Sequence, residues 1–236
     1  MNKTNHRWSA WGLAMTLAGF GCAVQAQTGL NAQLALGQLG YTVESSARHL
    51  WDGSAKAVTL GLDYALPNSF YVALGHTQAV SGSVDFSRGN TRGSASDFKR
   101  ADSAVTLGWA AANRLNTFVG LKSAATKIDN VVATQFKTTG FFVGLSYPIS
   151  FGSSYLSMSA AAGLNTGTWR DTSGPDVKDS AVGYSAGLKY SYAFTPSMVL
   201  GLGVKAQRYS YDFSQLGFGT VEEGVRLFDV SFTLAF

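Results

Sequence analysis

The chain ends in the segment VRLFDVSFTLAF, residues 225–236, in which apolar residues alternate with small or polar ones. From Phe228 onward every second residue is apolar, up to the terminal Phe236. Asp229, Ser231 and Thr233 stand between them. Because successive side chains of a strand point to opposite faces, this segment predicts a strand with one apolar face, one polar face and an aromatic end.

The same alternation recurs along the chain, and such a sustained period of two indicates strands rather than helices. The other alternating segments are 56–66, 70–77, 103–111, 116–124, 138–147, 155–164, 181–194 and 198–206. In the first segment, 30–43, the apolar phase changes between Leu36 and Leu39, and we expect a bulge near Gly37 to reconcile the two halves. The sequence therefore predicts about ten strands, with eight as the alternative.

The N-terminus has the pattern of a secretory signal peptide. Lys3 and Arg7 precede an apolar run that ends at Val24-Gln25-Ala26. We expect residues 1–26 to be removed and 27–236 to form one domain. A membrane anchor is less favoured because the run is rich in Gly and Ala. A lipoprotein signal at Cys22 is also less favoured, because the residues before it lack the expected Leu.

Composition narrows the possible functions. Charged residues make up 14% of the chain, whereas soluble domains carry about 25%. Without the signal, 18 − 2 = 16 basic residues face 14 acidic ones, so the mature net charge is +2 and no nucleic-acid partner is predicted. The single cysteine belongs to the signal, and we find no metal-ligand cluster, so we predict no disulfide, metal or cofactor.

Strands of about 10–13 residues are long enough to cross a bilayer core when tilted. In lipid a sheet must close on itself, because an unpaired backbone amide finds no water there. The sequence therefore predicts an all-β, closed, antiparallel, up-and-down transmembrane barrel. Pro67, Pro148 and Pro196 mark short turns, and longer polar connections are expected at 44–53, 79–100, 165–180 and 206–224.

Aromatic residues also gather near the expected strand ends. Tyr64, Phe70, Trp109, Tyr147, Phe151, Tyr155, Tyr192 and Phe194 flank the short turns and predict one interfacial girdle. Tyr41, Trp51, Trp169, Tyr209, Tyr211 and Phe213 lie near the long connections and would form or extend a second girdle.

With its signal, its alternating strands and Phe236 as the last residue, the chain resembles Gram-negative outer-membrane β-barrels, in particular the small opacity-type or surface barrels. The resemblance implies a location in the outer membrane, periplasmic termini and contact with membrane lipid and lipopolysaccharide. It also implies that Phe236 acts as an assembly signal for the barrel-assembly machinery. A soluble β-sandwich or lipocalin-like barrel is the alternative, with apolar side chains inside. That alternative would leave an outer surface with almost no charge.

The polar faces predict what lines the lumen, namely small residues together with Asp63, Lys122, Lys189, Lys205 and Asp229. Mixed charge favours internal ion pairing that stiffens the barrel. The alternative is a narrow, slightly cationic water path. Ten strands lie nearer to the filled eight-stranded barrels than to open porins.

We predict a non-enzymatic, monomeric protein with a structural, surface-contact or adhesion role, and a small diffusion channel is the first alternative. A lipid hydrolase or protease is the second. Its best base would be His76, near Asp85 in the sequence, and His49 near Asp52 is weaker. The basic stretch 87–100, with Arg88, Arg92, Lys99 and Arg100, would contact lipopolysaccharide or be a solvated loop.

Overall fold

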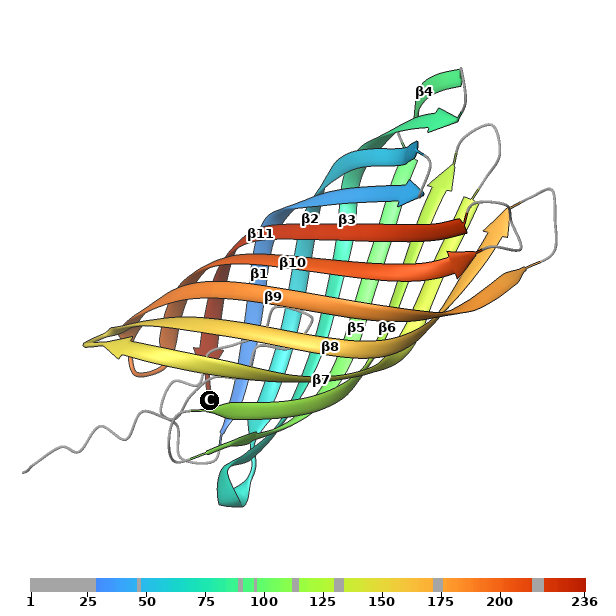
Figure 1. Cartoon of the computed structure of the whole chain (residues 1–236). Helices are drawn as coiled ribbons and strands as arrows, with labels where there is room; N and C mark the ends of the chain where they lie inside the picture. The colour runs from blue at the N-terminus through green and yellow to red at the C-terminus, as the bar shows by residue number, and fades with distance from the viewer. Residues whose placement is uncertain are drawn as a thin grey trace, which may run out of the picture.

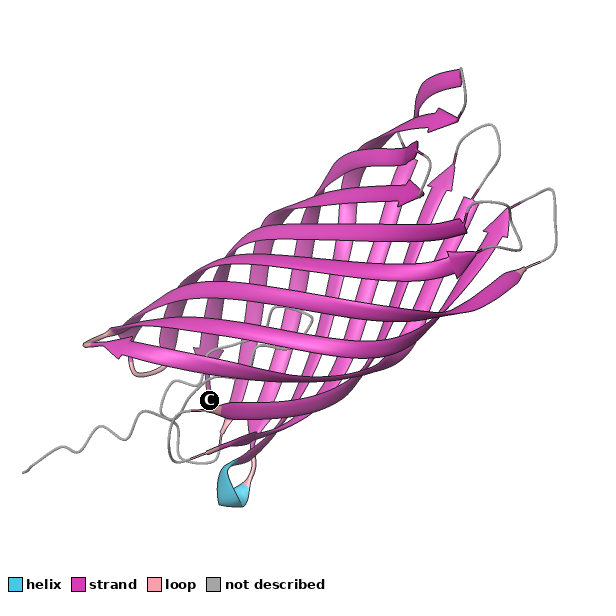
Figure 2. Ribbon diagram, viewed as in Figure 1, coloured by secondary structure: helices cyan, strands magenta, loops and turns pink. Residues whose placement is uncertain are grey.

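The computed structural model describes residues 29–45, 48–88, 91–95, 97–111, 115–129, 134–171, 176–213 and 219–236. The predicted signal peptide, 1–26, lies outside this set. Nearly all described residues belong to strands (Figure 2). No helix among them is long and apolar enough to cross a membrane.

Eleven strands and one short 3-10 helix follow one another along the chain. The strands are β1 (Leu30–Ser45), β2 (Arg48–Ala65), β3 (Phe70–Arg88), β4 (Thr91–Ala95), β5 (Asp97–Ala110), β6 (Asn116–Asp129), β7 (Thr134–Phe151), β8 (Ser154–Asp171), β9 (Val177–Thr195), β10 (Met198–Phe213) and β11 (Gly219–Ala235). The helix, Pro67–Ser69, makes the turn between β2 and β3. Pro67 occupies its first turn, where a missing N–H costs nothing.

The sheet closes into the predicted antiparallel barrel of ten strands. Along the wall each strand pairs with its neighbour in the chain, except that β3 pairs with β5, and β1 pairs with β11 to close the sheet (Figure 1). The short β4 is not an additional wall strand. It pairs with the upper part of β3, from Val84↔Ala95 to Arg88↔Thr91, and so prolongs the course of β5. At the closing seam the backbone N–H of Phe236 donates to the carbonyl of Leu30 at 2.9 Å.

The registers fix the stagger of the barrel. Paired residues followed once around from Ala32 return to Glu44 on the same strand, an offset of twelve residues (44 − 32). Ten strands with this stagger are tilted by about 40° to the barrel axis. In Figure 1 the near wall and the far wall accordingly cross.

The outer wall is apolar over the half of the barrel near the short turns. Leu60, Leu107, Leu121 and Phe232 all point outward, with between 37% and 66% of their surface exposed. Seven of the eight predicted turn-side aromatics are exposed as well, as an interfacial girdle requires: Tyr64, Phe70, Trp109, Tyr147, Phe151, Tyr192 and Phe194. The eighth, Tyr155, is partly buried and shares the phase of the buried Ser157. This orientation excludes the soluble alternative, in which the same residues would meet in a shared interior.

The strands are longer than predicted. The wall strands have 14 to 19 residues, and β3 and β5 take up much of the connection expected at 79–100. Since about 9–11 residues cross the bilayer core, the barrel continues well beyond the apolar belt on the loop side. We call this part the barrel extension.

The bulge expected near Gly37 is absent from β1. Its pairing with β11 is unbroken from Asn31 to Ser45, and the register shift with β2 lies at Val43/Glu44. Leu34 and Leu36 face outward, whereas Leu39 and Tyr41 are buried inside. The phase change therefore marks the height at which the wall leaves lipid and its apolar side turns inward.

Deletion of Phe236 should slow insertion of the barrel. The deletion removes the hydrogen bond to Leu30 at the closing seam and a side chain that is 74% exposed at the membrane boundary. We expect less folded protein in the membrane, measured by heat-modifiable migration on gels. Phe236→Tyr, which keeps an aromatic ring, is the control. Equal folding rates of the deletion and the wild type would contradict this role for Phe236.

Candidate functional site

The lumen is the natural place to look for a site, because it collects most of the buried polar residues. Its contents change with height: a polar layer near the turns, a charge cluster in the middle and an aromatic cap in the barrel extension.

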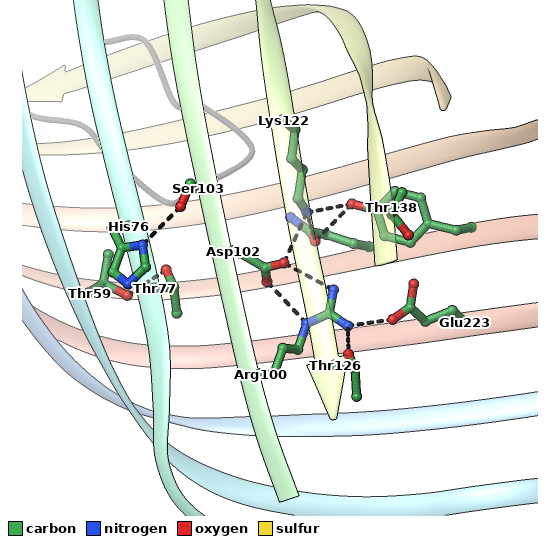
Figure 3. Close-up of polar contacts among 12 residues, drawn as sticks. Thr59, His76, Thr77, Arg100, Asp102, Ser103, Lys122, Thr126, Thr138 and Glu223 are labelled. Carbon is green, nitrogen blue, oxygen red and sulfur yellow. Dashed lines mark hydrogen bonds and ion pairs between the residues drawn. The ribbon is translucent and has the colours of Figure 1, made fainter. Parts of the chain in front are cut away.

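The charge cluster consists of Arg100 and Asp102 on β5, Lys122 on β6 and Glu223 on β11 (Figure 3). Arg100 donates to both carboxylate oxygens of Asp102 at 3.1 Å and also pairs with Glu223 across the lumen. Its third partner is the Thr126 hydroxyl, at 2.7 Å. Two cations face two anions, so the cluster is neutral as a whole.

Polar side chains from the facing wall complete the cluster. Lys122 donates to Oε1 of Gln207 at 2.6 Å and to the Tyr209 hydroxyl, and it lies 3.8 Å from Asp102. Tyr211 donates to Glu223 at 3.1 Å. Buried ions are tolerated in a protein only when they are paired and hydrogen-bonded in this way. The arrangement therefore joins opposite walls of the lumen.

The aromatic cap fills the barrel extension above the charge cluster. Trp51 stacks on Trp169 with ring centroids 5.0 Å apart, and Phe136 meets the edge of Tyr211 at 4.7 Å. Phe213 is fully buried beside them. The second girdle predicted from these aromatics is therefore wrong: they point into the lumen because the extension, surrounded by water outside, needs an apolar interior of its own.

Toward the turns the lumen is polar. Lys189 is buried and donates to Gln33 at 3.3 Å, while Asn31 donates to Asp63 at 2.7 Å. Several buried atoms there have no protein partner, namely Asn31 Oδ1, Tyr71 OH, Thr106 Oγ1, Ser157 Oγ, Asp229 Oδ1, Ser231 Oγ and Thr233 Oγ1. Buried polar atoms without protein partners are ordinarily satisfied by ordered water, so we infer that this layer is hydrated.

A cavity of about 10 Å³ lies between the polar layer near the turns and the charge cluster. It has room for about one water molecule. Thr77, Asp102, Lys205 and Leu227 line it. Lys205, half-buried, is thus placed at the wall of this cavity. The five charged residues expected in the lumen stand at different heights, and only Lys122 belongs to the charge cluster.

Sequence reasoning missed Arg100, Asp102 and Glu223 as lumen residues. The expectation that Arg100 contacts lipopolysaccharide or belongs to a solvated loop is wrong, because only 1% of its surface is exposed and it lies inside. The sequence does carry a signal: Phe98, Arg100, Asp102 and Ala104 share the phase of Gly108, one of the small residues on the inner face of β5. The stretch was read as a loop, so its alternation was not used.

The structure also separates His76 from its expected partner. His76 and Asp85 lie on the same strand nine residues apart (85 − 76), which is about 30 Å. His76 faces outward, and its Nδ1 lies 2.9 Å from Oγ of Ser103 on β5 (Figure 3). The side chain of His49 lies outside the described set. In the part of the chain that the structure describes, no three His, Cys, Asp or Glu side chains come together as metal ligands.

Glu223→Gln should destabilise the barrel strongly, whereas Glu222→Gln should not. Removing one partner of a buried ion pair leaves the other charge buried and typically costs about 3–5 kcal/mol. The neighbouring Glu222 points outward and pairs with Arg208, whose side chain is 66% exposed, so its loss should cost less than about 1 kcal/mol. Urea unfolding from lipid vesicles measures both, and equal losses would contradict the role given to the cluster.

Comparison with known proteins supports the fold. No protein-family model matches the chain, and no curated protein matches it in sequence. Among solved structures, the outer-membrane protease OmpT from Escherichia coli is similar, with a TM-score of 0.61 and 11% identity over 91% of this chain and 100% of that one. The translocator domain of the autotransporter NalP from Neisseria meningitidis gives 0.51 and 12%, over 89% and 90%.

Both similar proteins are outer-membrane barrels, and at this level of identity the likeness concerns the fold and not the activity. An apolar outer wall on a closed sheet is what a barrel needs in order to span a membrane. The chain therefore has the fold of a Gram-negative outer-membrane β-barrel, and its outer wall is built to lie in the lipid of that membrane.

Proposed function

We propose that the protein is a closed outer-membrane scaffold that meets its surroundings through the barrel extension. The observation that carries this proposal is the aromatic cap, which makes the extension a rigid body with its own core. A path for solutes does not need such a core, whereas a projecting contact surface does.

The outer surface of the extension supports a role in contact. This surface is polar, and several of its side chains form hydrogen bonds and ion pairs with side chains on the neighbouring segment. Arg170 donates to both oxygens of Asp176, at 2.6 and 2.5 Å, and this hydrogen bonding holds the pKa of the Asp176 carboxyl below its ordinary value. Ser94 on β4 donates to Asp85 on β3, which fastens the hairpin that rises above the other connections (Figure 1).

We infer three partners for this scaffold. Lys99, Lys127 and Lys137 point outward above the apolar belt, where phosphate groups of lipopolysaccharide would meet them. Lys99 and Lys127 stand directly opposite each other on β5 and β6. Membrane lipid covers the belt, and Phe236 would be read by the barrel-assembly machinery. We propose that the barrel works as a monomer, and its sheet is complete within one chain.

Shortening the β3–β4 hairpin tests the contact role. Replacing residues 87–92 by an Asn-Gly turn keeps the wall strands, because the pairing of β3 with β2 reaches only to Trp51↔Phe86 and Phe86 stands opposite Gly93. We expect folded protein at wild-type levels but a severalfold loss of cell attachment to surfaces. Ser83→Ala, at an exposed position of β3 below the shortened part, keeps the hairpin and is the control. Full attachment by the shortened protein would contradict the proposal.

The channel alternative predicts a different outcome. Because the described side chains fill the lumen from the charge cluster upward, we expect no stable conductance steps from the wild type in planar bilayers. Arg100→Ser combined with Phe136→Ser removes one bulky side chain from the charge cluster and one from the aromatic cap. This double variant should show stable conductance steps. Stable wild-type steps whose size changes in Lys122→Glu or Lys205→Glu would show that the lumen conducts.

A further inference from the structure

We propose that Ser103 and His76 form a lipid-facing catalytic pair that hydrolyses carboxylic esters of outer-leaflet lipids. This activity goes beyond the scaffold role, and it uses the outer wall of the barrel instead of the lumen.

The pair has the geometry of a nucleophile and its base. His76 and Ser103 are directly opposite each other in the β3–β5 ladder, and both point outward. In the tautomer that carries its proton on Nε2, His76 Nδ1 accepts a hydrogen bond from the Ser103 hydroxyl at 2.9 Å. A hydroxyl in such reach of an imidazole can be activated for attack.

The pair lies at the height where ester groups are found. Leu74 and Val105, one outward position nearer the turns, are 46% and 50% exposed and face hydrocarbon. Gln78 and Ala101, one position nearer the loops, mark the end of the paired ladder. The acyl esters of a membrane lipid lie at this boundary between hydrocarbon and head groups.

The backbone beside Ser103 is also unusual. The β3–β5 register stops at Gln78↔Ala101, and pairing with β3 resumes only in β4 at Val84↔Ala95. The Ala79 carbonyl accepts instead from the Gln78 side chain at 3.1 Å. The interruption begins two residues from Ser103, whose own position in the ladder is paired with His76.

The reaction proceeds in two balanced steps. Ser103 Oγ attacks the ester carbonyl carbon and passes its proton to His76 Nδ1, which returns it to the leaving alcohol oxygen as the ester C–O bond breaks. Water then attacks the acyl-serine with His76 again as base, which releases the carboxylic acid and restores Ser103.

The chain supplies a matched control. Ser123 lies directly opposite Ser103 on β6, on the same outer face, and it is separated from His76 by the width of β5. Ser123→Ala and Ser103→Ala therefore make the same chemical change at neighbouring points of the lipid-facing wall. Only one of them removes the hydroxyl that faces an imidazole.

The test uses the full chain folded in vesicles, with a fluorophosphonate probe for covalent labelling and release of fatty acid as the second readout. We expect labelling of the wild type and of Ser123→Ala, none of Ser103→Ala, and a decrease of about a hundredfold in His76→Ala. Release from phospholipid vesicles, compared with vesicles that contain lipopolysaccharide, identifies which lipid supplies the ester.

Labelling that persists in Ser103→Ala would overturn the proposal. So would a wild type that is neither labelled nor active on either lipid while its heat-modifiable migration shows a folded barrel. These outcomes do not depend on attachment or conductance, so the scaffold role and the esterase activity can fail separately.

Discussion

Hydrocarbon offers the backbone no hydrogen-bond partner, and the rest of this structure depends on that constraint. A sheet in lipid must leave no edge, so β1 has to meet β11 along its whole length, as it does from Asn31 to Ser45. Closing ten strands with a stagger of twelve fixes the tilt, and the tilt fixes the width of the lumen. The chemistry inside the barrel must then fit a bore of that width. Four charged side chains and their partners can reach across it, which is why one compact cluster is enough to join the walls.

The same constraint explains why each long strand carries two opposite apolar phases. Within the belt the solvent outside is apolar, so Leu200 and Leu202 face out while Gly201 and Gly203 face in. In the extension the outside is water, and on the same strand Tyr209, Tyr211 and Phe213 face in. Along β10 the outward and inward positions keep their alternation over the whole strand. Only the side that is apolar changes, and the change marks the membrane boundary along the sequence.

This inversion also accounts for how much could be predicted. The closed barrel, the strand count and the lipid-facing set followed from alternation, because the belt repeats one rule on every strand. The bulge at Gly37, the second girdle and the long loops are wrong for related reasons: a reversed apolar phase suggests a bulge within a strand or the end of a strand, although the strand continues without either. Contacts between distant strands were beyond reach. Arg100 and Glu223 are 123 residues apart, and only the register around the barrel brings them together.

Neutrality inside the lumen has a consequence for where chemistry can occur. A catalytic group needs a proton to move or a charge to develop, but each ion of the central cluster is held by several partners, and the cap above keeps bulk solvent away. Moving a proton there would leave a buried charge without its partner, at a cost of several kcal/mol. On the outer wall, the Ser103–His76 pair faces no such penalty, because its upper side borders the polar head-group region. In this barrel the ion pairs of the lumen stabilise the wall, and a reaction that moves a proton can therefore proceed on the outer face, at the edge of the lipid.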